Sequence, residues 1–270
     1  MQTARRSPVA IFTALLALLL AAPRLHAGTA LLIWPIDPTI EAGERSVALW
    51  LENVGRDPVT VQIRLFAWEQ RDYQDDYSVQ QQLVGTPPFS SIEPGKKQLI
   101  RLTTLQPVPA GQERAFRILI DEIPTARDTA ASAPTQANAG LRFQMRYSLP
   151  VFVYGKGLWR KNAPSGAKAA TAQAQPQLSW SLEEVEGQRY LQVHNAGSGY
   201  ARLSQVRMHA TTDGNPDAVA TQIDLAAGLL GYVLPGKTMR WPVSDKLTTQ
   251  DYSLQAQLAG GASPVTIAHR

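Results

Sequence analysis

Alternation of apolar and polar residues constrains the fold of this chain more than any other feature of its sequence. In segment 59–68, Val59, Val61 and Ile63 stand at every second position, and polar residues such as Arg64 lie between them. Successive side chains of a β-strand point to opposite faces of a sheet, so this period of two predicts a strand with one buried face. No convincing amphipathic helix pattern occurs beyond the N-terminal region. The sequence therefore predicts an all-β protein.

Turn-forming residues separate the apolar runs at short intervals, as at Asn53–Pro58 and Glu93–Gly95. Short strands with turns every 8–12 residues are typical of a β-sandwich. The segment Gly155–Gln175, rich in Ala, Lys and Gly, divides the strands into two series, and we predict two sandwich domains. The predicted parts are a first domain at 28–155, a linker at 156–174 and a second domain at 175–270.

Three other segments are predicted to lie outside strands. Asp75 and Asp76 are interpreted as a turn, and the segment from Pro87 to Gly95 as a loop between prolines. Residues 125–139 are rich in Ala, Thr, Ser and Pro and have no periodicity, which indicates a mobile loop.

The N-terminal residues resemble an export signal. Arg5 and Arg6 precede an apolar run, Val9–Ala22, which is too short to span a bilayer. Small residues before Gly28 form a cleavage site, so residues 1–27 are predicted to be a secretory signal peptide. The run has no polar face, which argues against an amphipathic helix of the core. We expect the mature protein to be exported to the periplasm.

Charge and composition exclude several functions. The chain has a formal charge of +4, but residues 1–27 contain three Arg and no acidic residue, which leaves 23 basic and 22 acidic residues. This balance does not fit nucleic-acid binding. There is no Cys, so neither a disulfide nor a thiolate nucleophile is available. Four His residues show no metal-ligand spacing, and no phosphate-binding or nucleophile motif occurs. We expect neither an enzyme nor a metal or cofactor site.

The segment 140–153 has the longest alternation in the chain. Its odd positions are apolar, and its even positions begin with Arg142, Gln144 and Arg146. A strand of this length would reach about 45 Å at ~3.3 Å per residue, so its first half can project from its own domain. One interpretation is an edge that adds a strand to a partner protein. The alternative is that all of these apolar side chains line the protein's own core, and the pattern alone does not decide.

Several short stretches resemble the periplasmic chaperones of chaperone–usher pili, in matching order and spacing. They are Gly85–Phe89, Ile92–Gly95, Ile100–Leu102, Asp121–Pro124, Pro150–Tyr154, Tyr232–Lys237 and Arg240–Trp241. Leu32–Pro35 and Ser148–Phe152 look most like the archaic branch of that family.

This resemblance implies two immunoglobulin-like sandwiches at an angle with a cleft between them. It implies that the chaperone lends a strand to an incomplete pilus subunit, a pilin, and delivers it to an outer-membrane usher. The resemblance leaves open whether the free protein covers the edge by self-association. The donor side chains that it implies are Leu141, Phe143, Met145, Tyr147 and Leu149.

Relatives hold the carboxylate of the subunit's C-terminus with two basic residues, and this chain departs from that pattern. Residues 28–40 contain no Lys or Arg, and the donor-strand position falls near Pro150. Arg101, Arg117 and Arg146 are the alternative anchors, because Arg can bind a carboxylate in bidentate geometry. We expected Arg101 first, since it interrupts an apolar strand, and each of the three can also be a solvated or ion-paired residue.

The resemblance also implies charged contacts that fix the angle between domains. Glu122 and Asp251 occupy matching positions, with Lys156 or Arg160 as the basic partner, unless these are surface charges that contribute little. Relatives suggest a cis peptide bond within Thr86-Pro87-Pro88. The alternative function is an immunoglobulin-like structural or adhesive module of the cell surface, because sandwiches serve many functions.

Overall fold

The computed structural model describes residues 31–124, 144–160, 172–210, 222–244, 252–259, 261 and 263–270. Within these ranges the regular structure consists of nineteen strands. The all-β prediction is confirmed. The predicted signal peptide and the loop 125–139 lie outside the described residues, as do Leu141, Phe143 and Asp251.

Two sheets form the first domain. The first sheet has the order β1-β3-β8-β6, and the second has the order β2-β10-β9-β4-β5, with β7 also paired to β4. The strands of the first sheet are β1 (Leu31–Trp34), β3 (Ser46–Asn53), β6 (Leu83–Thr86) and β8 (Lys97–Thr104). Those of the second are β2 (Thr39–Ile40), β4 (Val59–Arg71), β5 (Gln74–Val79), β7 (Phe89–Ile92), β9 (Glu113–Ile123) and β10 (Arg146–Tyr154).

The core of the first domain lies between these sheets, as the alternation predicts. Val59, Val61 and Ile63 of β4 face it, together with Ile118 and Ile120 of β9. The intervening residues of both strands therefore lie on the opposite face of the second sheet. We call this the inner face, because its residues contact the second domain.

Two predicted non-strand segments are strands. Asp75 and Asp76 belong to β5, and the preceding turn is at Asp72 and Tyr73, both with positive φ. The segment that we expected to be a loop contains the short strand β7. Both strands lie at the edge of the sheet and pair only with β4. An edge strand is covered on fewer sides than a central one, so its sequence can be short and polar. The expected cis peptide bond is present between Thr86 and Pro87, and a second one joins Trp34 to Pro35.

The second domain is a seven-stranded sheet in the order β16-β15-β18-β19-β13-β14-β17, folded around its own core. Trp180, Leu191 and Val206 are among the buried residues of this core. The strands are β13 (Leu178–Val185), β14 (Gln188–Asn195), β15 (Ala201–Ala210), β16 (Gln222–Val233), β17 (Thr238–Pro242), β18 (Tyr252–Leu258) and β19 (Val265–His269).

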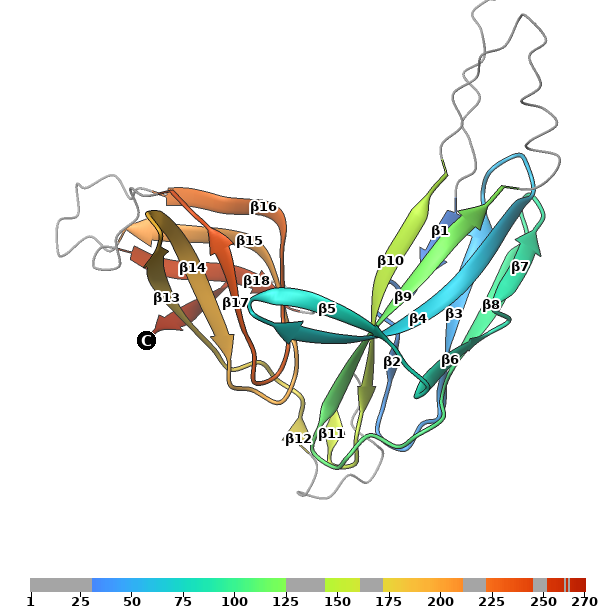
Figure 1. Ribbon diagram of the computed structural model, residues 1–270, viewed down its shortest axis with the longest axis horizontal. Coiled ribbons are helices and arrows are strands. Elements are labelled where there is room, and N and C mark those ends of the chain that lie inside the picture. Colours follow the sequence, from blue (N-terminus) through green and yellow to red (C-terminus); the bar gives the residue numbers. More distant parts are fainter. Residues whose placement is uncertain are drawn as a thin grey trace, which may run out of the picture.

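The two domains are set at an angle, as Figure 1 shows. The short parallel pair β11 (Leu158–Trp159) and β12 (Ala172–Gln173) lies between them in the chain. The hairpin of β4 and β5 extends from the first domain toward the second (Figure 1). We propose the predicted boundaries, 28–155 and 175–270, as the limits of these two domains.

Candidate functional site

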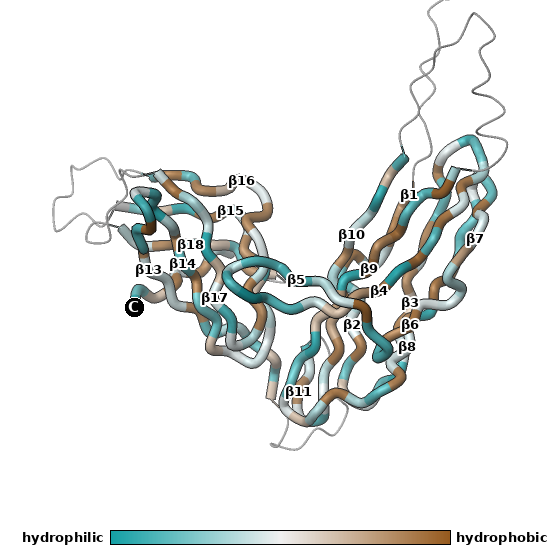
Figure 2. Tube along the Cα trace, in the orientation of Figure 1, coloured by the Kyte–Doolittle hydropathy of each residue, from teal (hydrophilic) through white to brown (hydrophobic). Residues whose placement is uncertain are grey.

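Strand β10 connects three environments. On one face, Leu149, Val151 and Val153 lie in the core of the first domain. On the inner face, Phe152 and Tyr154 lie in a buried cluster between the domains. At the start of the strand Arg146 and Ser148 are exposed, and only Tyr147 between them is half-buried against the first core. Figure 2 shows this change, with a hydrophilic tip and hydrophobic residues nearer the domain junction.

The outer edge of β10 is only partly paired. On one side the strand pairs with β9 along its whole length, from Arg146 opposite Asp121 to Tyr154 opposite Glu113. On the other side its partner is β2, which pairs only with Phe152 and Val153. In the part of the chain that the structure describes, the edge from Arg146 to Val151 pairs with no strand. Its backbone groups can therefore accept another strand.

The structure distributes the predicted donor side chains between the surface and the core. Met145 precedes β10 and is 45% exposed, whereas Tyr147 is half-buried against the first core. Leu149 is 8% exposed and belongs to that core, so in this structure it is not offered at the surface. The alternative that the odd residues line the protein's own core therefore describes the strand from Leu149 onward.

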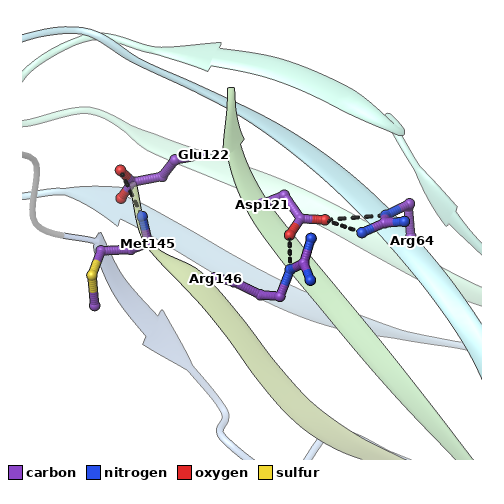
Figure 3. A network of polar contacts seen from close by, with 5 residues as sticks. All are labelled: Arg64, Asp121, Glu122, Met145 and Arg146. Carbon is purple, nitrogen blue, oxygen red and sulfur yellow. Dashed lines mark hydrogen bonds and ion pairs between the residues drawn. The ribbon is translucent and has the colours of Figure 1, made fainter. Parts of the chain in front are cut away.

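A charged network holds the start of β10 (Figure 3). Asp121 of β9 accepts a hydrogen bond from Nε of Arg146, which lies directly opposite on β10. Its other carboxylate oxygen accepts two from Arg64 of β4, at 3.1 Å from Nε and 2.7 Å from a terminal guanidinium nitrogen. Burial by itself raises the pKa of Asp121, but the bonds from both arginines outweigh burial and lower it.

Glu122 lies beside this network on β9. Its backbone N–H donates to the carbonyl oxygen of Met145 at 3.1 Å, and its side-chain Oε2 lies 3.5 Å from the backbone nitrogen of Met145 (Figure 3). This contact continues the β9–β10 pairing one residue beyond β10. Asp121 thus binds Arg146, the first residue of β10, and Glu122 binds Met145, the residue before it.

The three candidate anchors lie in different places. Arg101 of β8 is exposed on the first sheet, while its neighbours Ile100 and Leu102 face the core. Its side chain therefore points away from the second sheet and from β10. Arg146 is bound to Asp121, and Arg117 lies on the inner face opposite Pro150. Our first expectation, Arg101, does not fit a site next to β10.

Arg117 is surrounded by aromatic rings. Its guanidinium carbon is 4.0 Å from the ring centroid of Trp68, 5.6 Å from that of Tyr77 and 5.7 Å from that of Tyr232 in the second domain. One terminal nitrogen lies 3.3 Å from the Tyr77 hydroxyl, and Nε is buried with no hydrogen-bond partner among the described residues. Aromatic faces attract a cation but carry no net negative charge, so these ring contacts are not ion pairs.

The domains are joined by aromatic packing and by neutral hydrogen bonds. Phe152 stacks on Tyr200 with centroids 3.6 Å apart, and Trp68 meets Tyr232 edge to face at 5.2 Å. The side-chain amide of Gln70 donates to the carbonyl oxygen of Tyr232 and accepts from the N–H of Leu234, both at 2.9 Å. Gln70 is 3% exposed, so these two bonds between the domains are shielded from water.

The charged contacts that we expected between the domains are arranged differently. Glu122 lies at the Met145 end of β9, away from the domain contact, and Lys156 is exposed. Arg160 does reach the junction, because its guanidinium donates to the carbonyl oxygens of Ala174, at 2.8 Å, and Ala259, at 3.5 Å. The angle between the domains is therefore held mainly by residues that we did not predict from the sequence.

Glu113 is a buried acid at this junction. One carboxylate oxygen accepts the backbone N–H of Tyr200 at 3.0 Å, and the other is buried without a hydrogen-bond partner among the described residues. Burial raises the pKa of Glu113 to about 7, although the Tyr200 bond, Tyr154 and Arg160 each lower it. Burial also raises the pKa of Tyr200, to about 12, and that of Tyr154.

Sequence reasoning did not identify Trp68, Gln70, Glu113, Tyr232 and Asp121 as important residues. The first two stand at the polar positions of an alternating strand, where they resemble ordinary solvent-facing residues. Asp121 belongs to a stretch that carries the family resemblance, but only the register opposite Arg146 shows its role. Among the described residues, no group of His, Cys, Asp or Glu is suited to hold a metal ion, and no helix is long and apolar enough to cross a membrane.

Comparisons with known proteins agree with this architecture. A family model described as the N-terminal domain of pili and flagellar-assembly chaperones, PapD, matches residues 38–158. A search of curated proteins finds no match.

Among solved structures, one similar chain comes from the CsuC–CsuE chaperone–tip adhesion subunit pre-assembly complex of the archaic chaperone–usher Csu pili of Acinetobacter baumannii. It is 32% identical with a TM-score of 0.67, and the match covers 89% of this chain and 99% of that one.

Two more distant structures share the fold. The CupB2 chaperone of Pseudomonas aeruginosa is 20% identical, with a TM-score of 0.56 and coverage of 88% of this chain and 100% of that one. The structure of the SafA pilin with the SafB chaperone of Salmonella enterica matches at 16% identity and a TM-score of 0.56, with coverage of 88% and 96%. The prediction of two immunoglobulin-like domains is confirmed. On its identity and coverage with the archaic Csu structure, this chain belongs to the family of pilus-assembly chaperones.

Proposed function

We propose that this protein captures pilus subunits in the periplasm by adding the start of β10, with the residues before it, to a subunit that lacks a strand. The bound subunit then passes to an outer-membrane usher. The observation that carries the proposal is the outer edge of β10 from Arg146 to Val151, which pairs with no strand among the residues that the structure describes. Backbone hydrogen bonds along such an edge supply affinity, and alternate side chains supply register.

The side chains at this edge support the same function. Met145 is exposed on the same side as Tyr147, and Leu141 and Phe143 continue the apolar alternation toward the N-terminus. The incoming groove would bury these four residues and leave Leu149 in the chaperone. The edge thus has an apolar half for the subunit and a half that completes the chaperone's own core.

The subunit's C-terminal carboxylate is proposed to bind Arg117. This arginine lies on the inner face directly opposite Pro150 of β10, and it has an unpartnered buried Nε in the described structure. Arg146 is already bound to Asp121, and Arg101 points away from β10. Charge-assisted bonds to a carboxylate are about twice as strong as neutral ones, so one arginine in this position gives a directional anchor.

Donor-strand substitutions test the capture step. In the double variant Phe143→Asp/Met145→Asp, two carboxylates would enter an apolar groove, where unpaired burial costs several kcal/mol. We expect loss of the 1:1 complex when the variant is co-expressed with a pilin, while the chaperone keeps its melting temperature. The control Val79→Asp places one such carboxylate on β5 at a position that is 89% exposed, and it should leave capture unchanged.

Normal subunit capture by the double variant would refute the strand-donor proposal. Unfolding of the free variant would show instead that these residues belong to the chaperone's own core. Indifference of the wild-type protein to pilins would favour the adhesive or structural module.

The anchor is tested separately. Arg117→Ala should weaken the complex by about 1.5–3 kcal/mol, the range for hydrogen bonds to a charged group. Amidation of the pilin C-terminus should cause a similar loss with wild type and little further loss with the variant. Arg101→Ala is the matched control, and independent additive losses would remove Arg117 from the proposed role.

A further inference from the structure

The side-chain contacts that hold β10 change in kind along the strand. From Leu149 to Tyr154, most side chains are buried, either in the core of the first domain or between the domains. From Arg146 to Ser148 none is fully buried. Burial therefore fixes the second half of β10, whereas the first half has only the half-buried Tyr147 against the core and otherwise depends on backbone pairing with β9 and on polar side chains.

Asp121 is the centre of these polar contacts. Its side chain is 14% exposed, while that of Arg146 is 63% exposed and that of Arg64 is 38% exposed. It binds an arginine from each neighbouring strand, so it joins β4, β9 and β10 at the last pair of the β9–β10 ladder (Figure 3). Asp121 is a stronger constraint than one exposed ion pair, because it is largely buried and both of its oxygens are bonded.

We propose that Asp121 is a positioning residue that fixes where β10 leaves its own sheet, and hence the register in which the donor strand enters a subunit. This inference rests on the proposed strand-donor function. Burial holds the register of the second half of β10, but the first half could re-pair with β9 two residues away through a local bulge, because an antiparallel ladder repeats every two residues. A fixed last pair, Arg146 opposite Asp121, excludes that local shift on the chaperone side. Each apolar donor residue then meets one defined position of the groove.

The variant Asp121→Asn tests this role, because it removes the charge at nearly constant size. We expect amide hydrogen exchange at residues 145–148 to become about tenfold faster, with exchange at residues 151–154 unchanged. The control Glu52→Gln breaks an ion pair to Lys97 on the first sheet, at 3.6 Å, and should leave both segments unchanged. Unchanged exchange at residues 145–148 in Asp121→Asn would overturn the proposal. This measurement uses the free chaperone, so it is independent of whether subunits are captured.

A cross-link measures the register directly. The chain has no Cys, so Met145→Cys introduces a single thiol that can form a disulfide with single cysteines placed along a pilin groove. With Asp121 intact, one groove position should react. With Asp121→Asn, positions two residues away should react as well, and capture should weaken about fivefold to tenfold.

The variant Asp121→Glu keeps the acid, so its cross-links should form mainly at the single groove position that reacts with the wild-type register. A single reactive position in Asp121→Asn would refute the register role. If the wild-type chaperone captures no pilin at all, the strand-donor function fails, and the role of Asp121 in register fails with it, even where the exchange result holds.

Discussion

The two ends of β10 are held by different physical forces. At the Tyr154 end, Phe152 stacks on Tyr200 in a buried cluster, and Gln70 bonds the backbone of the second domain. At the Arg146 end, the contacts are a cross-strand ion pair and a backbone bond from Glu122 to Met145. A buried aromatic cluster is stable and opens rarely, whereas exposed polar contacts open easily.

This difference suits the two tasks that the proposed function assigns to the strand. One end must keep the domains together, so that the inner face and Arg117 retain their geometry. The other end must leave its own sheet far enough to enter a subunit. A strand that was buried along its whole length could not be offered to a partner, and one that was exposed throughout would be an aggregation hazard.

The largest effect is expected at the buried end. Phe152→Ala removes a fully buried ring, and such substitutions cost about 3–5 kcal/mol. We expect a large loss in chemical denaturation and a wider range of domain angles in small-angle scattering. Phe89→Ala is the matched control, because Phe89 is 55% exposed and its loss should cost under about 1 kcal/mol. Similar costs for both variants would mean that the junction is not a stabilising core.

Glu113 should make the stability of the domain junction depend on pH. Its pKa is raised from 4.5 to about 7 in the folded protein, so the folded state binds more protons than the unfolded chain between these values. The stabilising contribution of the protonated acid is complete below pH 4.5 and is lost as the pH rises to about 7. The loss is at most about 3 to 4 kcal/mol, since each pKa unit corresponds to about 1.4 kcal/mol.

The variant Glu113→Gln checks this prediction by chemical denaturation from pH 5 to pH 8. The uncharged amide can still accept the Tyr200 N–H, so the variant should lose this part of the pH dependence and exceed the wild type in stability at pH 8. Glu93→Gln, which removes an exposed carboxylate, should keep the wild-type slope. A parallel slope in Glu113→Gln and wild type would show that Glu113 is ionised throughout.

The sequence predicts these two ends unequally well. The period of two identifies the second half of β10 as a strand, because Leu149, Val151 and Val153 alternate into one core. The pattern cannot distinguish that core from a partner's groove, and the apolar residues before Leu149 continue the same alternation. Where burial ends is a property of the whole sandwich, so only the structure separates Tyr147 from Leu149.

The domain junction was harder to predict for a different reason. Aromatic residues such as Trp68 and Tyr232 are far apart in sequence, and their contact depends on the angle between domains. Charged residues were expected there by resemblance, whereas the contact is made largely by Gln70 and by stacked rings. The position of Arg117 shows the same limit, because its charge was evident in the sequence but its aromatic surroundings were not.

The smallest effect on stability is expected at the exposed end. Arg146→Ala removes the cross-strand partner of Asp121, but Arg64 still binds that carboxylate, so no buried charge is left alone. An exposed cross-strand ion pair contributes about 0.2–1 kcal/mol, and the Arg146 side chain is 63% exposed. Urea denaturation should therefore place Arg146→Ala within about 1 kcal/mol of wild type, close to the control Arg71→Ala, whose side chain is 64% exposed and pairs with Glu69.

Limited proteolysis should nevertheless cut Arg146→Ala faster near residues 144–148 than it cuts the control, because the local opening of this end needs less free energy than global unfolding. A global loss of 2 kcal/mol or more in Arg146→Ala would place the start of β10 within the cooperative core, and the contrast between the two ends of the strand would then fail.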